Sequence, residues 1–322
     1  MNRLTKKIGS LVVITALGVT TLTGCKKEVA SFPSSPIQII VPFSAGGGTD
    51  TVTRAVANAA KDQFSQPLVV VNKTGAGGAV GIGEGANSKA DGYTVTTICS
   101  ELSTLPAQNL AEFTNEDFRP ITQLNAEPAS ITVKADAPYN TAEEFFAYAK
   151  ENEGKIVIGN SGVGAIWHLA ALAIEKSAGV KFNHIPYEGA SPAIAALLGG
   201  HIQAVTVSPA EVAAQVKAGE LKILAIADNE RAKEFPDVPT LKESGYDVVI
   251  GTWRGLAVPK DTPDDVYNVL KDGFAKAVED PSFVDFMKKS GLNIEVLVDK
   301  DFVQKLDDER MFFTELVKGF KK

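Results

Sequence analysis

The sequence is poor in the residues on which metalloenzymes and disulfide-rich proteins depend. In 322 residues it holds two cysteines, Cys25 and Cys99, and three histidines. Cys25 lies in the N-terminal leader described below, so Cys99 has no intrachain partner and a disulfide framework is excluded. Cys99 follows the apolar run 94–98 and is predicted to be a small buried side chain. The histidines lack the short spacing that is typical of a zinc site; they are His168, His184 and His201.

Positive charge is also scarce. The net charge is −7, and removal of the leader with Arg3, Lys6 and Lys7 leaves −10 for the mature chain. This balance argues against nucleic acid as a partner, because basic stripes dominate that affinity. It does not exclude an anionic ligand, since loops and helix ends attract anions locally. The length predicts one large or two ordinary domains.

Long hydrophobic runs are missing except near the N-terminus. Residues 1–25 combine a basic start, an apolar middle over 8–19 and the stretch Leu22–Cys25, which resembles a bacterial lipobox. The run is too short for an ordinary spanning helix. A lipoprotein signal with lipidation at Cys25 is therefore predicted, with a plain secretory signal or an uncleaved anchor as alternatives. Residues 26–35 form a tether. Acyl chains would hold the protein on the outer face of the bacterial cytoplasmic membrane, at the cell surface or in the periplasm.

The stretch 37–50 organises the rest of the chain. Ile37–Val41 is a β-branched apolar run that predicts a buried strand, and a helix is expected over 51–64. Between them, Gly46, Gly47 and Gly48 permit backbone angles that side chains would forbid. We expect Thr49 or Asp50 to cap the helix, and free amides at its positive end to form an anion site. A strand–turn–helix without any ligand is the alternative.

Further strands alternate with helices along the chain, which predicts an α/β fold with mostly parallel sheets. A second small-residue turn, 159–164, follows the strand 156–158 and precedes a helix over 165–177. It is the second candidate anion site. His168 lies in the first turn of that helix, either as a structural histidine or as a ligand contact. Catalysis is disfavoured, because Val163 replaces the last glycine of a G-x-S-x-G motif around Ser161.

Several motifs, taken in order, resemble the solute-binding proteins of tripartite tricarboxylate transporters, the TctC/Bug family. Together they cover about residues 36–322. They are Pro42–Asp50, Asn72–Gly78, Ala90–Thr94, Ser161–Gly164 with His168–Leu169, Ile185–Gly189 with Pro192–Ala193, Pro236–Thr240 and Trp253–Leu256.

The resemblance implies a two-lobed type II periplasmic-binding-protein fold, the "Venus flytrap", with two hinge crossings near 122–130 and 247–255. Lobe 1 would comprise 36–126 plus 252–322, and lobe 2 would comprise 127–251. The implied ligand-binding residues of lobe 1 are Phe43, Ala45, Gly46, Gly47, Thr49, Asp50, Asn72, Gly75, Ala76, Gly77 and Gly78. Those of lobe 2 are Ser161, Gly164, His168, Tyr187 and Gly189.

The resemblance also implies a receptor, without catalytic residues, metal or cofactor, that binds a small carboxylate-containing ligand between its lobes. The ligand would be a mono-, di- or tricarboxylate or an amino acid, and the further partners would be the membrane subunits of the transporter. No nucleic acid is expected, and a monomer is expected. A ligand-sensing lipoprotein is the alternative, and an extracytoplasmic hydrolase is a more distant one. Three departures from the family pattern bear on the ligand: Ala165 lacks a hydroxyl donor, Glu188 replaces a frequent lysine, and Gln203 replaces a frequent aspartate.

Overall fold

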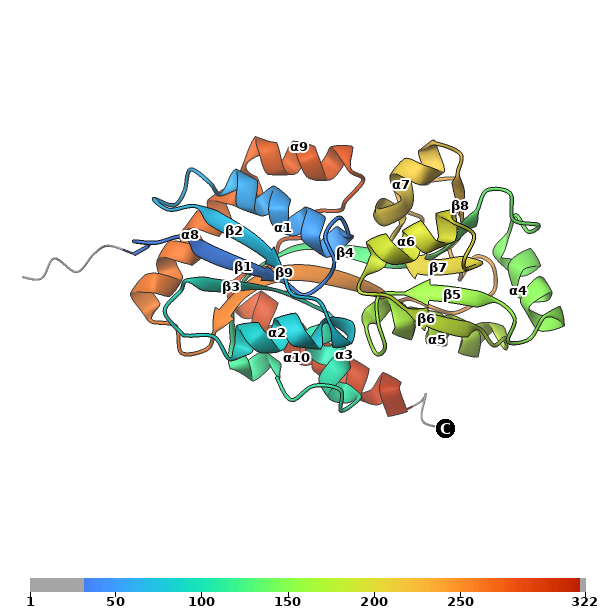
Figure 1. The fold of residues 1–322 in the computed structure, drawn as a ribbon, viewed down its shortest axis with the longest axis horizontal. Helices are drawn as coiled ribbons and strands as arrows, with labels where there is room; N and C mark the ends of the chain where they lie inside the picture. The colour runs from blue at the N-terminus through green and yellow to red at the C-terminus, as the bar shows by residue number, and fades with distance from the viewer. Residues whose placement is uncertain (1–31, 319–322) are drawn as a thin grey trace, which may run out of the picture. The chain divides into compact units, whose positions relative to one another are not determined.

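The computed structural model describes residues 32–318 (Figure 1). The predicted leader, the tether residues before Phe32 and the lipidation at Cys25 lie outside the described residues. Within the described part, no helix combines the length and the hydrophobicity needed to span a bilayer. In this part of the chain nine strands form one sheet, in which eight follow the order β2–β1–β3–β9–β4–β7–β5–β6 and β8 pairs with β4 beside this path.

The first half of this path is built mainly from the N-terminal part of the chain. Strands β1 (Ile37–Val41), β2 (Leu68–Asn72) and β3 (Thr94–Cys99) are parallel, and β9 (Gly251–Pro259) runs antiparallel to β3. Helices α1 (Gly48–Ala59), α8 (Asp264–Glu279) and α9 (Pro281–Lys289) pack on one face in one hydrophobic cluster. Helices α2 (Ala79–Ala86), α3 (Glu101–Ala107) and α10 (Asp299–Lys318) share a second cluster on the other face (Figure 1).

The second half is built from the middle of the chain. Strand β5 (Val157–Asn160) lies parallel to β6 (Asn183–Pro186) and β7 (Ala204–Val207). The strand β8 (Leu221–Ala227) flanks β4. Helices α4 (Ala142–Glu151), α5 (Ile166–Ala178), α6 (Ala190–Leu198) and α7 (Pro209–Lys217) pack around these strands. Their buried side chains, almost all between residues 129 and 250, form a separate hydrophobic cluster.

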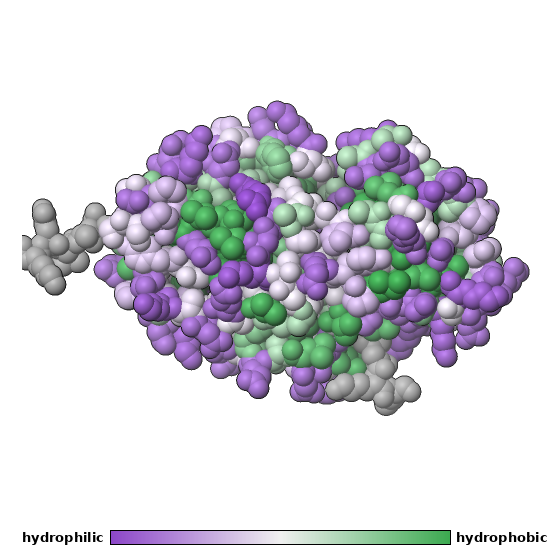
Figure 2. Space-filling model, viewed as in Figure 1, coloured by the Kyte–Doolittle hydropathy of each residue, from purple (hydrophilic) through white to green (hydrophobic). Residues whose placement is uncertain are grey.

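One long strand links the two halves. β4 (Phe118–Lys134) pairs with β9 through its first part and with β7 and β8 through its second. The returning chain crosses beside it, where Ala129 N donates to Ile250 O over 2.9 Å. On the face drawn in Figure 2, hydrophobic residues gather in separate patches divided by hydrophilic ones. Beneath the surface, most of the buried hydrophobic side chains belong to the three clusters.

Several local predictions need correction. Four of the eight strand pairings among the described residues are antiparallel, so the sheet is mixed rather than mostly parallel. The first helix begins at Gly48 and ends at Ala59, and its N-cap is Gly47, so a cap by Thr49 or Asp50 was wrong. Residues 236–246 form turns, and near 294–298 the chain makes only a single bridge, between Thr122 and Val298. Helix α3 was not predicted.

Candidate functional site

Glycine-containing loops make the contacts between the two halves of the sheet. Gly77, in the loop after β2, lies against the turn after β5, because a Cβ on Gly162 would stand 2.6 Å from Gly77 Cα. A second approach joins the loop after β1 to the start of α6, where Ser44 N donates to Glu188 O over 2.9 Å. A Cβ on Gly189 would stand 2.5 Å from Ser44 Oγ. At both places glycine is required because backbone packs directly on backbone or on a short side chain.

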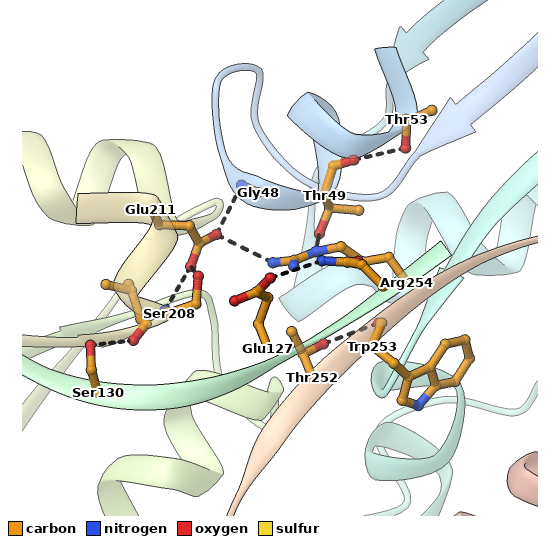
Figure 3. A network of polar contacts seen from close by, with 12 residues as sticks. Gly48, Thr49, Thr53, Glu127, Ser130, Ser208, Glu211, Thr252, Trp253 and Arg254 are labelled. Atoms are coloured by element: carbon orange, nitrogen blue, oxygen red, sulfur yellow. Dashed lines mark hydrogen bonds and ion pairs between the residues drawn. The ribbon is translucent and has the colours of Figure 1, made fainter. Parts of the chain in front are cut away.

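Helix α1 begins without a capping side chain, because its N-cap is Gly47. Its first amide, Gly48 N, instead donates to Glu211 Oε1 over 2.9 Å (Figure 3). Glu211 lies at the start of α7, where its other oxygen accepts from Ser208 N over 2.9 Å. A carboxylate at a helix N-terminus is stabilised by the free amides and by the helix dipole. An acidic side chain from the other half of the sheet therefore occupies the end of α1.

The N-terminus of helix α5 is also satisfied by a carboxylate from the other half of the sheet. Its N-cap is Ala165, which cannot accept a hydrogen bond through its side chain, and Ile166 N donates to Glu101 Oε1 over 2.9 Å. Glu101 belongs to α3 and is 1% exposed. Burial raises the pKa of Glu101, and bonds from the Cys99 thiol and the Ile166 amide oppose that rise. Cys99 is itself buried, as predicted.

Arg254 lies between these helix ends, on β9, and is 1% exposed. Its Nη2 is 3.5 Å from Glu211 Oε1, and its Nε donates to Thr49 Oγ1 over 3.2 Å (Figure 3). A Cβ on Gly48 would stand 2.5 Å from Arg254 Nη2, so only glycine admits the guanidinium at this point. Nearby, burial raises the pKa of Glu127 to about 7, and the positive charge of Arg254 opposes that rise.

These groups line one small cavity between the two halves of the sheet. Its free volume is about 20 Å³, which is room for about one water molecule. Three buried polar atoms of the lining residues have no hydrogen-bond partner within residues 32–318: Glu101 Oε2, Ser161 Oγ and Arg254 Nη1. Because buried polar atoms are almost always paired, this concentration marks the cavity as a ligand-binding candidate. The full lining is Phe43, Gly47, Gly48, Thr49, Glu101, Ser161, Ile166, Trp167, Ala190, Glu211, Thr252 and Arg254.

Four of the predicted site residues line this cavity: Phe43, Gly47, Thr49 and Ser161. Others brace the loops around it. Asp50 is buried and accepts from Gly46 N over 2.9 Å, while Asn72 Nδ2 donates to Asp50 Oδ1 and to Phe43 O. Bonds from Arg54, Asn72 and Gly46 outweigh burial and lower the pKa of the Asp50 carboxyl.

The remaining predicted residues lie beside the cavity. Gly78 packs under the Phe43 ring, and Gly164 O accepts from Gln108 Nε2 over 2.8 Å. The Tyr187 ring packs near Gly159. The other neighbours in the glycine loops are Ala45, Gly46, Gly75, Ala76 and Gly77, of which Ala45, Gly46 and Ala76 are exposed.

For His168 the structure favours the structural alternative. His168 Nδ1 accepts from Gly164 N over 3.1 Å, so the ring closes the turn that precedes α5. Burial, with a contribution from neighbouring His184, lowers the pKa of His168 to about 4. Two departures from the family pattern also point away from the cavity, since the side chains of Glu188 and Gln203 are exposed. Gln203 Oε1 accepts from Val157 N over 2.9 Å.

Sequence reasoning missed the charged residues of the cavity, Glu101, Glu211 and Arg254. Arg254 could have been noticed in the sequence, because it is a charged residue in the otherwise apolar family motif at 253–256. Glu211 could also have been noticed, since Ser208 and Glu211 have the spacing of a capping box. No sequence feature indicated Glu101.

Comparison with known proteins identifies the family. A sequence model of the tripartite tricarboxylate transporter family receptor, TctC, matches residues 52–319. The chain belongs to the TctC family. It is 34% identical to the "UPF0065 protein in gbd 5'region" of Cupriavidus necator over 88% of this chain and 86% of the relative. It is 31% identical to "Protein BugT" of Bordetella pertussis over 81% of this chain and 82% of that relative.

Solved structures of TctC relatives share the fold. A TctC solute-binding protein from Polaromonas, solved without ligand, is 47% identical, with a TM-score of 0.65 over 90% of this chain and 100% of that one. The periplasmic binding protein BugD is 32% identical, with a TM-score of 0.85 over 89% and 98%. MatC from Rhodopseudomonas palustris, with bound malate, is 25% identical, with a TM-score of 0.81 over 89% and 100%. The predicted two-lobed type II periplasmic-binding-protein fold is confirmed.

Proposed function

We propose that this TctC-family chain is an extracytoplasmic solute receptor that closes two lobes around a small carboxylate-containing metabolite and delivers it to a membrane permease. The observation that carries the proposal is that the two predicted glycine turns, 46–48 and 159–164, both contribute to the lining of one buried polar cavity that contains Arg254. A buried guanidinium with a free nitrogen is suited to a carboxylate. The malate bound to MatC supports this class of ligand.

The lobes are assigned as 36–126 plus 252–322 and 127–251, with β4 and β9 carrying the hinge. The separate hydrophobic clusters support this division, because each lobe then keeps its own core when the lobes move. The TM-scores add support. A rotation of one lobe lowers a whole-chain TM-score without altering either lobe, and the 47% identical Polaromonas protein superposes less well than the 32% identical BugD.

Outside the cleft, we propose that Cys25 carries the lipid anchor and that the receptor is a monomer. Delivery to a signalling partner instead of a permease would use the same closure. Hydrolysis is less favoured, because His168 Nδ1 is engaged by Gly164 N rather than by Ser161. Membrane fractionation of a Cys25→Ser variant tests the anchor. If Cys25 carries the lipid, the variant is lost from the membrane fraction.

Isothermal calorimetry against mono-, di- and tricarboxylates and amino acids tests the ligand-binding proposal. We expect at least one compound to bind, and Ser161→Ala to weaken its binding about 3- to 10-fold because one hydrogen bond is lost. Ser177→Ala, an exposed position on α5, is the matched control and should bind as the unmodified protein does. Absence of binding across the whole panel would refute the proposal, and hydrolytic turnover that Ser161→Ala abolishes would replace it with catalysis.

A further inference from the structure

Helix α10 packs against the hydrophobic cores of both proposed lobes (Figure 1). Near its start, Phe302 and Leu306 are buried in the cluster that contains Trp253 of lobe 1. Towards its end, Phe313 is 2% exposed and belongs to the cluster of lobe 2. Among the described residues, Phe313 is the only buried member of that cluster from outside 129–250. One helix therefore reaches from the core of lobe 1 into the core of lobe 2.

The helix is rigid and is anchored in lobe 1. Residues 299–318 contain no glycine or proline and form one uninterrupted α-helix, and sharp kinks seldom occur without such residues. Glu309 Oε2 accepts from Trp253 Nε1 over 2.6 Å, and Asp307 Oδ1 accepts from Asn115 Nδ2 over 2.7 Å. Both donors belong to lobe 1. We therefore expect α10 to move with lobe 1 as a unit, with its C-terminal turns at the point where it contacts lobe 2.

The contact between the end of α10 and lobe 2 is narrow. A cavity of about 400 Å³ lies beside it, with a lining that includes Ala173 on α5, Val248 before β9, and Phe312 and Leu316 on α10. Lobe 2 and the end of α10 thus face each other across free space, whereas the ring of Phe313 is enclosed. A contact centred on one aromatic ring can separate while the helices and strands of each lobe stay in place.

This contact is formed in a closed arrangement of the cleft. Ser44 N donates to Glu188 O across the cleft over 2.9 Å, and the cavity between the halves has a volume of only about 20 Å³. Rotation of lobe 2 away from α10 would uncover the Phe313 ring, and rotation towards α10 would press the ring into side chains that already enclose it. Either motion costs free energy, so the contact favours closure in the absence of a ligand.

We propose that the C-terminal turns of α10 are a hydrophobic clasp, which holds the two lobes together through Phe313 and sets how far the empty receptor is closed. This inference rests on the proposed lobe closure and adds a third link between the lobes, beside β4 and β9. Because a ligand binds the closed arrangement, its apparent affinity depends on the closed fraction that the clasp maintains. The end of α10, which chain order assigns to lobe 1, then acts on both lobes.

Hydrogen exchange of the whole chain without ligand tests the clasp. Two amides report opening, because Ser44 N and Gly48 N donate across the cleft to Glu188 O and Glu211 Oε1. Their exchange rates follow the population of the open arrangement, whereas amides within the core strand β5 exchange only when lobe 2 unfolds. An effect on lobe opening therefore appears at the two cross-cleft amides, and an effect on the lobe 2 core alone appears only in β5.

Phe313→Ala removes the enclosed ring. We expect exchange at the two cross-cleft amides to become about 10- to 100-fold faster, which is the effect of exposing one buried aromatic side chain. Phe313→Leu retains an apolar side chain and should show a smaller change in the same direction, which keeps the test valid if Phe313→Ala prevents folding. Met311→Ala is the matched control, since Met311 lies on the same helix and is 58% exposed, and should exchange as the unmodified protein does.

Each other outcome contradicts the clasp. If Phe313→Ala accelerates exchange in β5 and leaves the cross-cleft amides unchanged, Phe313 is only a core residue of lobe 2. If the cross-cleft amides of the unmodified protein exchange as fast as in an unfolded chain, the contact does not hold the empty receptor closed. If Met311→Ala acts like Phe313→Ala, the effect does not arise from the enclosed ring. Failure of the proposed function is distinct, because it appears as an absence of binding in calorimetry, whatever the exchange rates are.

Discussion

Replacement of Glu211 by alanine is predicted to shift the receptor toward an open arrangement of its lobes. The change removes the bond from Gly48 N, at 2.9 Å, and the ion pair with Arg254 Nη2, at 3.5 Å, both of which cross between the proposed lobes. It also leaves the Arg254 guanidinium buried without its carboxylate. Opening of the cleft would return that guanidinium to water.

The size of the shift follows from these contacts. A hydrogen bond to a charged group is worth about 1.5–3 kcal/mol, and removal of one partner of a buried ion pair costs about 3–5 kcal/mol when the other stays buried. Because only the closed arrangement keeps the unpaired guanidinium buried, the second cost adds to the lost hydrogen bond, and we expect the closed arrangement to lose at least about 1.5–3 kcal/mol relative to the open one. That is about a 10- to 150-fold change in the lobe equilibrium.

Small-angle X-ray scattering, with and without a ligand found by calorimetry, measures this shift as an increased radius of gyration of the variant. Glu220→Ala, an exposed position just after α7, is the matched control and should scatter as the unmodified protein does. Thermal unfolding gives a separate measure. Glu211 also accepts from Ser208 N within its own lobe, and loss of that helix cap costs about 1 kcal/mol of unfolding free energy.

Two results would refute this reasoning. If unfolding free energy falls by about 1 kcal/mol while the scattering stays unchanged, Glu211 acts only as a helix cap within its lobe. If the unmodified protein is already open in solution and Glu211→Ala changes neither scattering nor ligand affinity, the contacts across the cleft do not hold the lobes together.

Three further predictions concern closure, pH and salt. Gly162→Ala places a Cβ 2.6 Å from Gly77 Cα, so calorimetry should show about 10-fold weaker ligand binding; Gly154→Ala, also at positive φ but with open space around it, should bind normally. Burial raises the pKa of Glu309 from 4.5 to about 7, so the folded state holds this proton more tightly than the unfolded chain. Denaturant titrations should therefore show stability falling as pH rises from about 5 to 8, by up to about 3 kcal/mol for this group, with a shallower fall in Glu309→Gln; an equal fall in both proteins would contradict this assignment. The chain carries a net charge of −7, so salt should strengthen the binding of any dicarboxylate by screening and leave a zwitterion nearly unaffected; a zwitterion with the salt dependence of a dicarboxylate would contradict it.

Local sequence patterns predicted the parts of the site that depend on the backbone. The β-branched run Ile37–Val41 and the following glycines predicted a buried strand and a turn, and the structure has both. The turn at 159–164 was predicted from the same signals and lies opposite the loop around Gly77. Such features depend on neighbours in the chain, which is why a single sequence is sufficient to find them.

The charged groups of the cavity could not be predicted in this way. Thr49 and Asp50 have the composition of a helix cap, but the end of α1 is satisfied by Glu211, more than 160 residues away in the chain. An arginine such as Arg254 in an apolar strand is expected to be exposed until its buried counter-ion is known. These partners are brought together only by the folding of the long strand β4 across both lobes.

Each half of the sheet supplies a carboxylate to a helix N-terminus of the other half, and this limits which contacts remain for a ligand. If the amides at the starts of α1 and α5 had only a ligand carboxylate as a partner, the ligand would gain their full hydrogen-bond energy on closure. Because Glu211 and Glu101 accept from Gly48 N and Ile166 N, closure satisfies those amides without a ligand. A ligand shifts the equilibrium only through contacts that differ between the open and closed arrangements. The unpaired atoms of Arg254, Ser161 and Glu101 are available for such contacts, and two of these residues, Arg254 and Glu101, lie outside the two glycine turns.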